Sequence, residues 1–331
     1  MSAKEVSILG AGGWGTALAV LFADRGMRVN LWGYDAEQVG KLSESRTNER
    51  YLPGVMLAEG IVPTNDLEDC AGGEVVLFVT PSKALRVVAE RFAKVKLRDG
   101  TPLVSCTKGI EHASGLRMSE VLREYFPGHA IGALSGPNLA AEIARRMPAA
   151  AALAFSDLGV AERLQPLFST PYFRSYTSDD VAGVELGGAL KNIYAIAAGV
   201  SDGLGFGDNS KAALETRALV ELVRLGVSLG GRRETFYGLS GLGDLVVTCF
   251  SRHSRNRGLG ERLGRGESLE EITARMSGIA EGVPTTLSAY ECARRANVST
   301  PIVDQVHAML FEQKAPKAAL VDLMSRDPRA E

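Results

Sequence analysis

A lysine in a strongly apolar stretch is the first candidate for chemistry. Residues 181–200 contain only two charged side chains, Glu185 and Lys191, and Lys191 lies among the small residues Gly187, Gly188, Ala189, Ala195 and Ala197. Small neighbours allow close helix packing, so we expect the Lys191 ammonium to be partly buried and suited to general acid/base catalysis. A lysine whose stem lies along the helix while its amine stays in water gives the same pattern. Asn192 is the adjacent polar candidate.

A second polar region lies between residues 241 and 257. Asp244 is the one carboxylate of the turn Gly241-Leu242-Gly243-Asp244, which we expect to be flexible, and three arginines fall within residues 252–257 together with Ser254 and Asn256. Guanidinium groups bind phosphate through paired hydrogen bonds, so this stretch predicts a phosphate site. A solvated basic loop has the same composition, and both interpretations stay open at this point.

Residues 10–15, Gly-Ala-Gly-Gly-Trp-Gly, match the G-x-G-x-x-G pattern of dinucleotide sites. They follow an apolar run and begin a helical pattern, as such a site requires. Gly10 allows the tight turn, Gly12 lets the backbone approach a pyrophosphate, and Gly15 lets the helix pack closely on the strand. The helix N-terminus then faces the phosphates. A glycine-rich turn without a ligand is the alternative.

Three further polar turns follow apolar runs, at residues 80–82, 107–109 and 135–138. Ligands of open parallel sheets bind beyond the carboxyl ends of the strands, so these turns are candidates for the rest of the site. Lys108 is the only cation among them.

In the first half of the chain, short apolar runs alternate with helical patterns. This alternation predicts an α/β fold with a Rossmann-type parallel sheet, which must position the candidate residues. Strands are expected at Val6–Leu9, Val29–Trp32, Val75–Val79, Leu103–Cys106 and Ile131–Leu134, with Ala150–Phe155 and Phe173–Tyr176 extending the same sheet.

Helical patterns take over from Ser178 onward, beginning with Val181–Val200 and Lys211–Leu229. Ser268 with Glu271 predicts a capping box, and Pro301 and Pro316 are expected at first helical positions. We therefore expect a NAD(P)-binding Rossmann domain over residues 1–178 and an all-helical substrate and catalytic domain over residues 179–331.

Charge and cysteine usage exclude several classes of protein. The 331 residues carry 37 Lys+Arg against 39 Asp+Glu and no basic block, so nucleic acid is not an expected partner. No apolar run is longer than Ala149–Phe155, which is far shorter than the roughly 20 residues of a membrane helix. The start of the chain lacks a signal peptide's apolar region, and the four cysteines lack C-x-x-C spacing. We expect reduced thiols, no metal and a cytoplasmic location.

Several motifs then occur in one order along the chain. They are GAGGWGTALA at 10–19, CTKG at 106–109, SGPN at 135–138, GGALKN at 187–192, GLGDLVVTC at 241–249 and SRNR at 254–257. With this set the chain resembles the bacterial-type NAD(P)-dependent glycerol-3-phosphate dehydrogenases from residue 6 to about 285. The resemblance implies hydride exchange between NADP or NAD and C2 of dihydroxyacetone phosphate, giving sn-glycerol 3-phosphate for phospholipid synthesis.

The same resemblance implies roles for individual residues. Lys191 would donate and accept the proton, with Lys108 and Asp244 as its catalytic companions at the substrate. Further substrate contacts would come from Gly136, Asn138, Asn192, Ser254, Arg255 and Asn256. Cofactor contacts would come from Gly10, Gly12, Gly13, Trp14, Gly15, Tyr34, Lys108, Ala140, Arg255, Ile279 and Glu281. One position departs from the pattern, since Asn138 stands where many relatives carry a Thr or Ser hydroxyl.

Two alternatives stay open beside this function. One is a related two-domain dehydrogenase that acts on a hydroxy acid, because the same layout serves many substrates. The other is a dinucleotide-sensing protein without catalysis, which would need the glycine motif but neither Lys191, Lys108 nor Asp244. The resemblance also makes a homodimer possible.

The end of the second expected strand bears on the choice between NADPH and NADH. NAD-specific sites place a carboxylate there to hold the ribose 2′-hydroxyl. The sequence has Trp32-Gly33-Tyr34 instead, and Asp35 follows late enough for its side chain to point elsewhere. Arg46 and Arg50 lie downstream and are candidates to reach a 2′-phosphate. We expect NADPH to be accepted at least as well as NADH.

Overall fold

The computed structural model describes residues 4–276 and 278–327 and divides into two compact units. The first contains the residues up to Lys108 together with Leu116–Glu185, and the second contains Gly109–Gly115 and the chain from Leu186 onward. The structural boundary therefore falls at Glu185, later than the expected position near residue 178. Residues 179–185 stay with the first unit because Glu185 accepts hydrogen bonds from the Ser119 amide and the Arg117 guanidinium.

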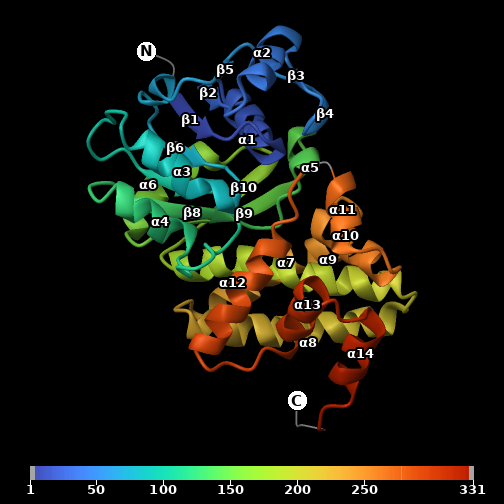
Figure 1. Ribbon diagram of the computed structural model, residues 1–331. Coiled ribbons are helices and arrows are strands. Elements are labelled where there is room, and N and C mark those ends of the chain that lie inside the picture. The colour runs from blue at the N-terminus through green and yellow to red at the C-terminus, as the bar shows by residue number, and fades with distance from the viewer. Residues whose placement is uncertain (1–3, 277, 328–331) are drawn as a thin grey trace. The chain divides into compact units, whose positions relative to one another are not determined.

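The first unit is built on an eight-stranded sheet (Figure 1). Its strands are β1 (Glu5–Leu9), β2 (Arg28–Trp32), β5 (Ile61–Thr64), β6 (Val76–Phe78), β7 (Leu103–Ser105), β8 (Ile131–Ser135), β9 (Ala149–Phe155) and β10 (Phe173–Ser178). Their spatial order is β10-β9-β8-β7-β6-β1-β2-β5. This confirms the predicted Rossmann-type fold, and all seven predicted strands are present.

The expectation of a parallel sheet fails at one position. Strand β9 pairs antiparallel with β8, while β10 runs parallel to β9, so these two strands oppose the rest. The link between β8 and β9 contains only α5 (Ala140–Ala144). A helix of five residues is about 8 Å long and cannot run back along a strand of about 17 Å, as a parallel crossover must. Apolar patterns do not encode strand direction.

Three short strands were not predicted. Two of them, β3 (Thr47–Asn48) and β4 (Leu52–Met56), form an antiparallel pair, and β5 forms one edge of the main sheet. Each lacks a continuous apolar run, and Pro53 and Pro63 interrupt the pattern. The remaining helical elements of the first unit are α1 (Gly13–Ala23), α2 (Ala36–Ser45), η1 (Glu68–Cys70), α3 (Ser82–Phe92), α4 (Met118–Tyr125) and α6 (Leu158–Phe168).

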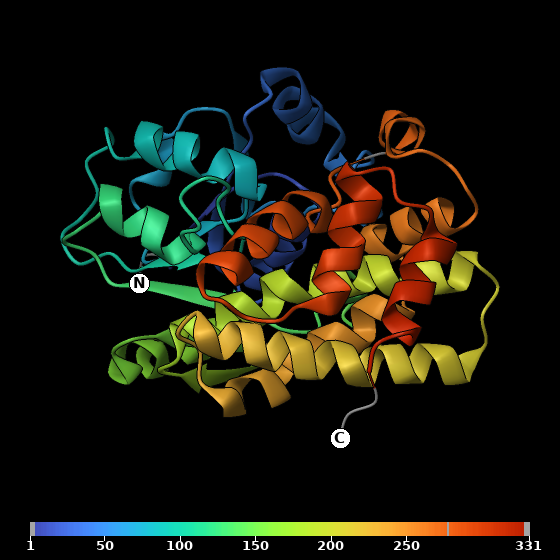
Figure 2. The same cartoon turned by 60° about the horizontal axis from the view of Figure 1, so that its bottom comes forward.

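From Leu186 onward, all the helices and strands that the structure describes in the second unit are helices, as expected, whereas its segment Gly109–Gly115 is not helical. Figures 1 and 2 show its two long helices, α7 and α8, side by side. Its elements are α7 (Val181–Gly203, which begins in the first unit), α8 (Asp208–Ser228), η2 (Arg233–Tyr237), η3 (Leu239–Gly243), α9 (Asp244–Phe250), α10 (Arg255–Gly264), α11 (Leu269–Arg275), α12 (Gly282–Arg295), α13 (Pro301–Phe311) and α14 (Pro316–Met324).

The helix start signals of this unit are confirmed. Ser268 and Glu271 form a reciprocal capping box, and Pro301 and Pro316 occupy the first turns of α13 and α14. Across the described residues, no helix combines the length and the apolarity needed to cross a bilayer.

The start of α13 depends on a carboxylate from another helix. Glu221 of α8 is buried and accepts hydrogen bonds from the backbone amides of Ile302 (3.0 Å) and Val303 (2.9 Å). These are two of the amides that a helix N-terminus leaves without intrahelical partners. Burial raises the pKa of Glu221 from 4.5 to about 7, although both amides oppose the shift.

This raised pKa predicts a pH-dependent contribution to stability. The folded state holds the Glu221 proton up to about pH 7, whereas the unfolded chain releases it near 4.5. The stabilisation is complete below pH 4.5 and is lost as the pH rises through 7, by about 3 kcal/mol at 1.36 kcal/mol per unit. Glu221→Gln should remove this component, so thermal melts from pH 5 to 8 should show the variant gaining stability relative to the parent chain. Exposed Glu270→Gln should show no such trend, and a constant difference for Glu221→Gln would contradict the assignment.

Candidate active site

The glycine turn between β1 and α1 has the geometry that the motif predicts. A side chain at Gly15 would place its Cβ 1.8 Å from the Gly10 carbonyl oxygen, so only glycine allows this contact of helix and strand. Gly10 has a φ of +135°, and its Cβ would lie 2.5 Å from the Val79 oxygen. No atom lies within 4 Å of the position of a Cβ at Gly12. The backbone at Gly12 therefore faces open space at the N-terminus of α1, which suits an approaching pyrophosphate.

Side chains from outside the motif fix the turn in place. Asn48 donates to the Ala11 carbonyl oxygen (3.0 Å) and to Thr16 Oγ1 (2.7 Å), and Gln38 also donates to the Ala11 oxygen (3.0 Å). Beside it, Trp14 has a buried indole N–H without a hydrogen-bond partner among the described residues. A rigid turn, an open glycine and an unused donor together fit a dinucleotide phosphate.

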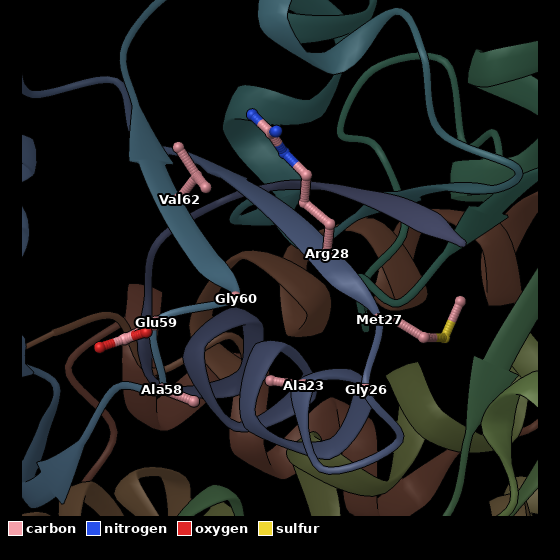
Figure 3. Close-up of a pocket in the computed structure, with 8 residues that line it drawn as sticks. All are labelled: Ala23, Gly26, Met27, Arg28, Ala58, Glu59, Gly60 and Val62. Atoms are coloured by element: carbon pink, nitrogen blue, oxygen red, sulfur yellow. The ribbon is translucent and has the colours of Figure 1, made fainter. Parts of the chain in front are cut away.

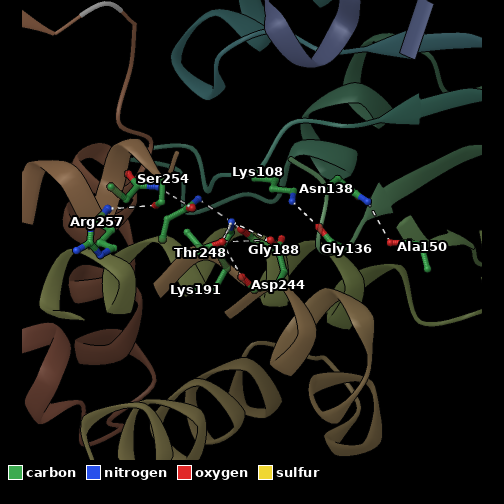
Figure 4. Close-up of polar contacts among 12 residues, drawn as sticks. Lys108, Gly136, Asn138, Ala150, Gly188, Lys191, Asp244, Thr248, Ser254 and Arg257 are labelled. Carbon is green, nitrogen blue, oxygen red and sulfur yellow. Dashed lines mark hydrogen bonds and ion pairs between the residues drawn. The ribbon is translucent and has the colours of Figure 1, made fainter. Parts of the chain in front are cut away.

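The polar turns after β7 and β8 lie next to each other within the first unit (Figure 4). Lys108 Nζ donates to the Gly136 carbonyl oxygen (2.9 Å), which joins two predicted substrate residues. Asn138 donates to the Ala150 oxygen at the start of β9 (3.0 Å), and its own Oδ1 is buried without a described partner. The amide thus presents an acceptor at this position. Ala140 begins α5.

The residues that follow the carboxyl end of β2 agree with expectation except for Arg46. Asp35 caps α2 by accepting from the amides of Glu37 and Gln38, so its side chain points elsewhere, as predicted. Tyr34 is 78% exposed. Arg46, however, donates to the carbonyl oxygens of Ala58 and Ile61, and this role in fixing the chain makes it a poor ligand for a 2′-phosphate. These bonds use Arg46 Nη2 and hold the side chain on the backbone, which disfavours the hypothesis that Arg46 reaches the cofactor.

Lys191 of α7 is buried, as predicted, at 6% exposure. Its ammonium lies 3.0 Å from Asp244 Oδ1 and donates to Thr248 Oγ1 at 2.6 Å (Figure 4). Asp244 is 1% exposed, so the charges compensate each other inside the unit. The interpretation of Lys191 as a lysine with its amine in water is wrong.

Thr248 is a site residue that sequence reasoning missed. It lies four residues after Asp244, which places both side chains on one face of α9. Its hydroxyl accepts from Lys191 and donates to the Asp244 carbonyl oxygen (2.6 Å). That spacing is the signal that was available in the sequence.

A turn of π-helix, η3, brings Asp244 to the lysine, where a flexible turn was expected. A Cβ at Gly187 of α7 would lie 2.7 Å from the Ser240 oxygen, and one at Gly241 would lie 2.1 Å from the Phe236 oxygen. Both glycines therefore allow backbones to touch where side chains would separate them. This contact sets the distance between Lys191 and Asp244.

The predicted phosphate loop is the start of helix α10. Ser254 is its N-cap and accepts from the Arg257 amide (3.2 Å). Asn256 is buried, donates to Asn192 Oδ1 (2.8 Å) and accepts from the Gly282 amide (2.9 Å), so it joins α7, α10 and α12.

The three arginines of this stretch have different environments. Arg257 Nε lies 2.7 Å from Asp202, and this ion pair removes it from the expected cluster. Arg255 is exposed at the first position of α10, and Arg252 is exposed in the preceding turn. A Cβ at Gly278 would lie 2.7 Å from Arg255 Nη1, so Arg255 lies against the segment that contains Ile279 and Glu281.

Glycines also hold α10 directly against α7. A Cβ at Gly260 would lie 2.0 Å from the Ile196 oxygen, and one at Gly199 would lie 2.0 Å from the Arg257 oxygen. Gly203 and Gly264 make equivalent contacts one turn further on. This interlocked pair fixes the N-terminus of α10, with Ser254 and Arg255, relative to the helix that carries Lys191.

A shallow pocket in the first unit lies elsewhere (Figure 3). It is lined by residues around Arg28 and Gly60, before and at the amino ends of β2 and β5. The glycine turn lies at the opposite end of β1 and β2, so this pocket is not part of the cofactor site.

The fold and these two groups of residues define a dinucleotide-binding dehydrogenase with a helical second domain. The sequence models of NAD-dependent glycerol-3-phosphate dehydrogenase match residues 5–161 for the N-terminal and 180–321 for the C-terminal domain. The chain belongs to this family.

Individual relatives match this chain over nearly their whole length. The chain is 48% identical to the glycerol-3-phosphate dehydrogenase [NAD(P)+] of Syntrophotalea carbinolica and 46% identical to that of Geobacter metallireducens, with 99% of each chain covered. The crystal structure of glycerol-3-phosphate dehydrogenase from Coxiella burnetii superposes with a TM-score of 0.94 at 38% identity, covering 98% of this chain and 99% of that one.

The interlock of α7 and α10 gives a prediction with a control in the same helix. Gly260→Ala places a methyl group on the Ile196 oxygen, so we expect α10 to shift and the unfolding free energy to fall by about 1–3 kcal/mol or more. Gly258→Ala adds its methyl group in open space and should stabilise the helix by up to about 1 kcal/mol. Denaturant unfolding of both variants measures the difference, and similar effects at the two positions would refute the interlock.

Proposed function

We propose that this chain catalyses the reversible transfer of a hydride between NAD(P)H and dihydroxyacetone phosphate, with sn-glycerol 3-phosphate as the reduced product. The observation that carries the proposal is the buried Lys191 with its two partners, Asp244 and Thr248, in a chain that also holds an open glycine turn. A sensing protein has no need of a buried proton donor. The names of the relatives support the substrate.

The chain's own residues supply the proton and the charge for ketone reduction. Negative charge develops on the ketone oxygen as C2 accepts the hydride, and a positioned cation stabilises it. Lys191 provides this charge and then its proton, so the alcohol forms and the amine recovers a proton from solvent. Asp244 keeps the ammonium oriented, and Thr248 fixes the same group from a second direction.

The nicotinamide dinucleotide, when bound, supplies the hydride. Gly10, Gly12 and Gly15 let the pyrophosphate approach the N-terminus of α1, and Trp14 adds its indole N–H. We assign further cofactor contacts to Gly13, Tyr34, Lys108, Ala140, Arg255, Ile279 and Glu281.

The substrate phosphate requires its own binding group. Arg255 supplies a guanidinium, and the N-terminus of α10, capped by Ser254, supplies backbone amides and a favourable dipole. Asn256 and Asn192 hold this helix end in place through their mutual hydrogen bond. We assign Lys108, Gly136 and Asn138 to the substrate as well.

The enzyme's role in phospholipid synthesis supports a cytoplasmic location, and so do its four cysteines, which are buried and free. The resemblance to the family supports a homodimer. Both assignments stay part of the proposal.

Replacing the proton donor tests the mechanism. Lys191→Met keeps the length of the side chain and removes its charge, so kcat should fall by roughly 10²–10⁴-fold while cofactor affinity stays nearly constant. Turnover is measured as NADPH oxidation with dihydroxyacetone phosphate, and cofactor affinity by titration. Lys317→Met, on the exposed face of α14, should leave both unchanged. Near-normal turnover of the Lys191 variant would show that another group donates the proton.

Replacing the guanidinium tests the phosphate assignment. Charge-assisted hydrogen bonds contribute about 1.5–3 kcal/mol, so Arg255→Ala should lower kcat/KM for the phosphorylated substrate by roughly 10- to 150-fold. The reaction with unphosphorylated dihydroxyacetone should change little. Arg252→Ala is the matched control from the same stretch. Equal losses for both substrates, or a loss in the Arg252 variant, would contradict the role of Arg255.

A further inference from the structure

An arginine without a role in the proposed function lies beside the end of β2. Arg91, in the last turn of α3, is exposed, and its guanidinium carbon lies 5.6 Å from the ring centre of Tyr34 and 5.8 Å from that of Trp32. The two rings meet edge to face at 6.5 Å. Arg91 is therefore held by two aromatic side chains of the strand end where a Rossmann site places the adenosine ribose.

The contacts of the glycine turn fix the position of this strand end. The Gly10 amide donates to the Trp32 carbonyl oxygen (2.9 Å), so β2 ends directly beside the turn that would hold the pyrophosphate. Trp32 is buried, and its indole N–H donates to the Asn65 oxygen (3.1 Å). The Trp32 ring is thus a fixed platform for the cation, whereas the Tyr34 ring lies in the open.

The other charged side chains near the end of β2 either have partners within the protein or lie in a groove that repels phosphate. The Asp35 carboxylate caps α2, and Arg46 binds backbone oxygens. Arg50 lies on the Tyr51 ring and lines a groove whose charged side chains are four carboxylates and two cations, itself and Lys41. The excess of negative charge in that groove repels a phosphate group, which leaves Arg91.

We propose that Arg91 binds the 2′-phosphate of NADPH and so favours the phosphorylated cofactor. A guanidinium that stacks through its face keeps its N–H groups in the plane, free to donate. Within residues 4–276 and 278–327, the structure gives the Arg91 side chain no hydrogen bond or ion pair of its own. Nothing inside the described chain competes with a phosphate for these donors. This inference rests on the proposed function, because it assumes that the first unit binds a nicotinamide dinucleotide.

Calorimetric titration of the full chain with two nucleotides tests the proposal without any catalytic readout. Adenosine 2′,5′-bisphosphate carries the 2′-phosphate, and adenosine 5′-monophosphate lacks it. The parent chain should bind the bisphosphate more tightly, and Arg91→Gln should weaken that ligand about 10-fold or more while changing the monophosphate less than about 3-fold. The difference between the ligands should shrink as salt is raised, because an exposed charge pair is screened.

Two variants provide the controls. Arg50→Gln removes the competing cation and should leave both affinities unchanged, and Arg91→Lys keeps the charge and should retain part of the preference. The inference is overturned if the parent chain binds both nucleotides equally, if Arg91→Gln weakens both to the same extent, or if Arg50→Gln causes the loss. Failure of the parent chain to bind either nucleotide would instead overturn the proposed cofactor site, and this inference with it.

Discussion

The buried ion pair of Lys191 and Asp244 is the interaction on which the second unit depends. Removing two charges from water costs several kcal/mol per ion, and only a partner at close range offsets that cost. The pair is 3.0 Å apart, and the Thr248 hydroxyl fixes the ammonium from a second helical turn. Without Asp244, the buried ammonium would lose the carboxylate that lies 3.0 Å from it. The surrounding helices must therefore hold α9 against α7 within tenths of an ångström, and a catalytic amine is thereby given one orientation.

In both units, glycines let backbone segments touch, and these contacts fix the positions of the helices. In the first unit, Gly15 lets α1 touch the turn at Gly10, and in the second, Gly187 lets α7 touch η3. Gly260 and Gly199 do the same for α7 and α10. A Cβ at any of these positions would lie between 1.8 and 2.7 Å from a backbone oxygen, closer than van der Waals contact allows, so the two elements would have to move apart. The high glycine content of the chain, 37 residues, thus serves close packing in addition to turns.

Sequence reasoning identified what depends on local pattern and motif. The strands, the capping box at Ser268 and the burial of Lys191 follow from apolar periodicity and composition, and the structure confirms them. The direction of β9 depends on pairing across the sheet, which local pattern does not contain. Arg46 binds the carbonyl oxygens of Ala58 and Ile61, and Arg257 pairs with Asp202 as well as with Glu261 one turn further on; the contacts with Ala58, Ile61 and Asp202 exist only in the folded chain, so the sequence did not reveal them. The roles of the site residues in catalysis and binding stay predictions.

The arginines of this chain differ in function because they differ in the protein groups that already bind them. Arg46 and Arg257 have the same chemistry as Arg255, but backbone oxygens already bind the Arg46 Nη2 group, and the carboxylates of Asp202 and Glu261 already bind Arg257. Such an arginine stabilises the fold, since its hydrogen bonds are satisfied internally and an incoming phosphate would have to break them. Arg255 is exposed at a helix N-terminus, where the dipole adds to its charge and attracts an anion. The sequence alone does not distinguish these arginines. The groups that each one contacts in the structure show which arginine can bind a ligand and which stabilises the fold.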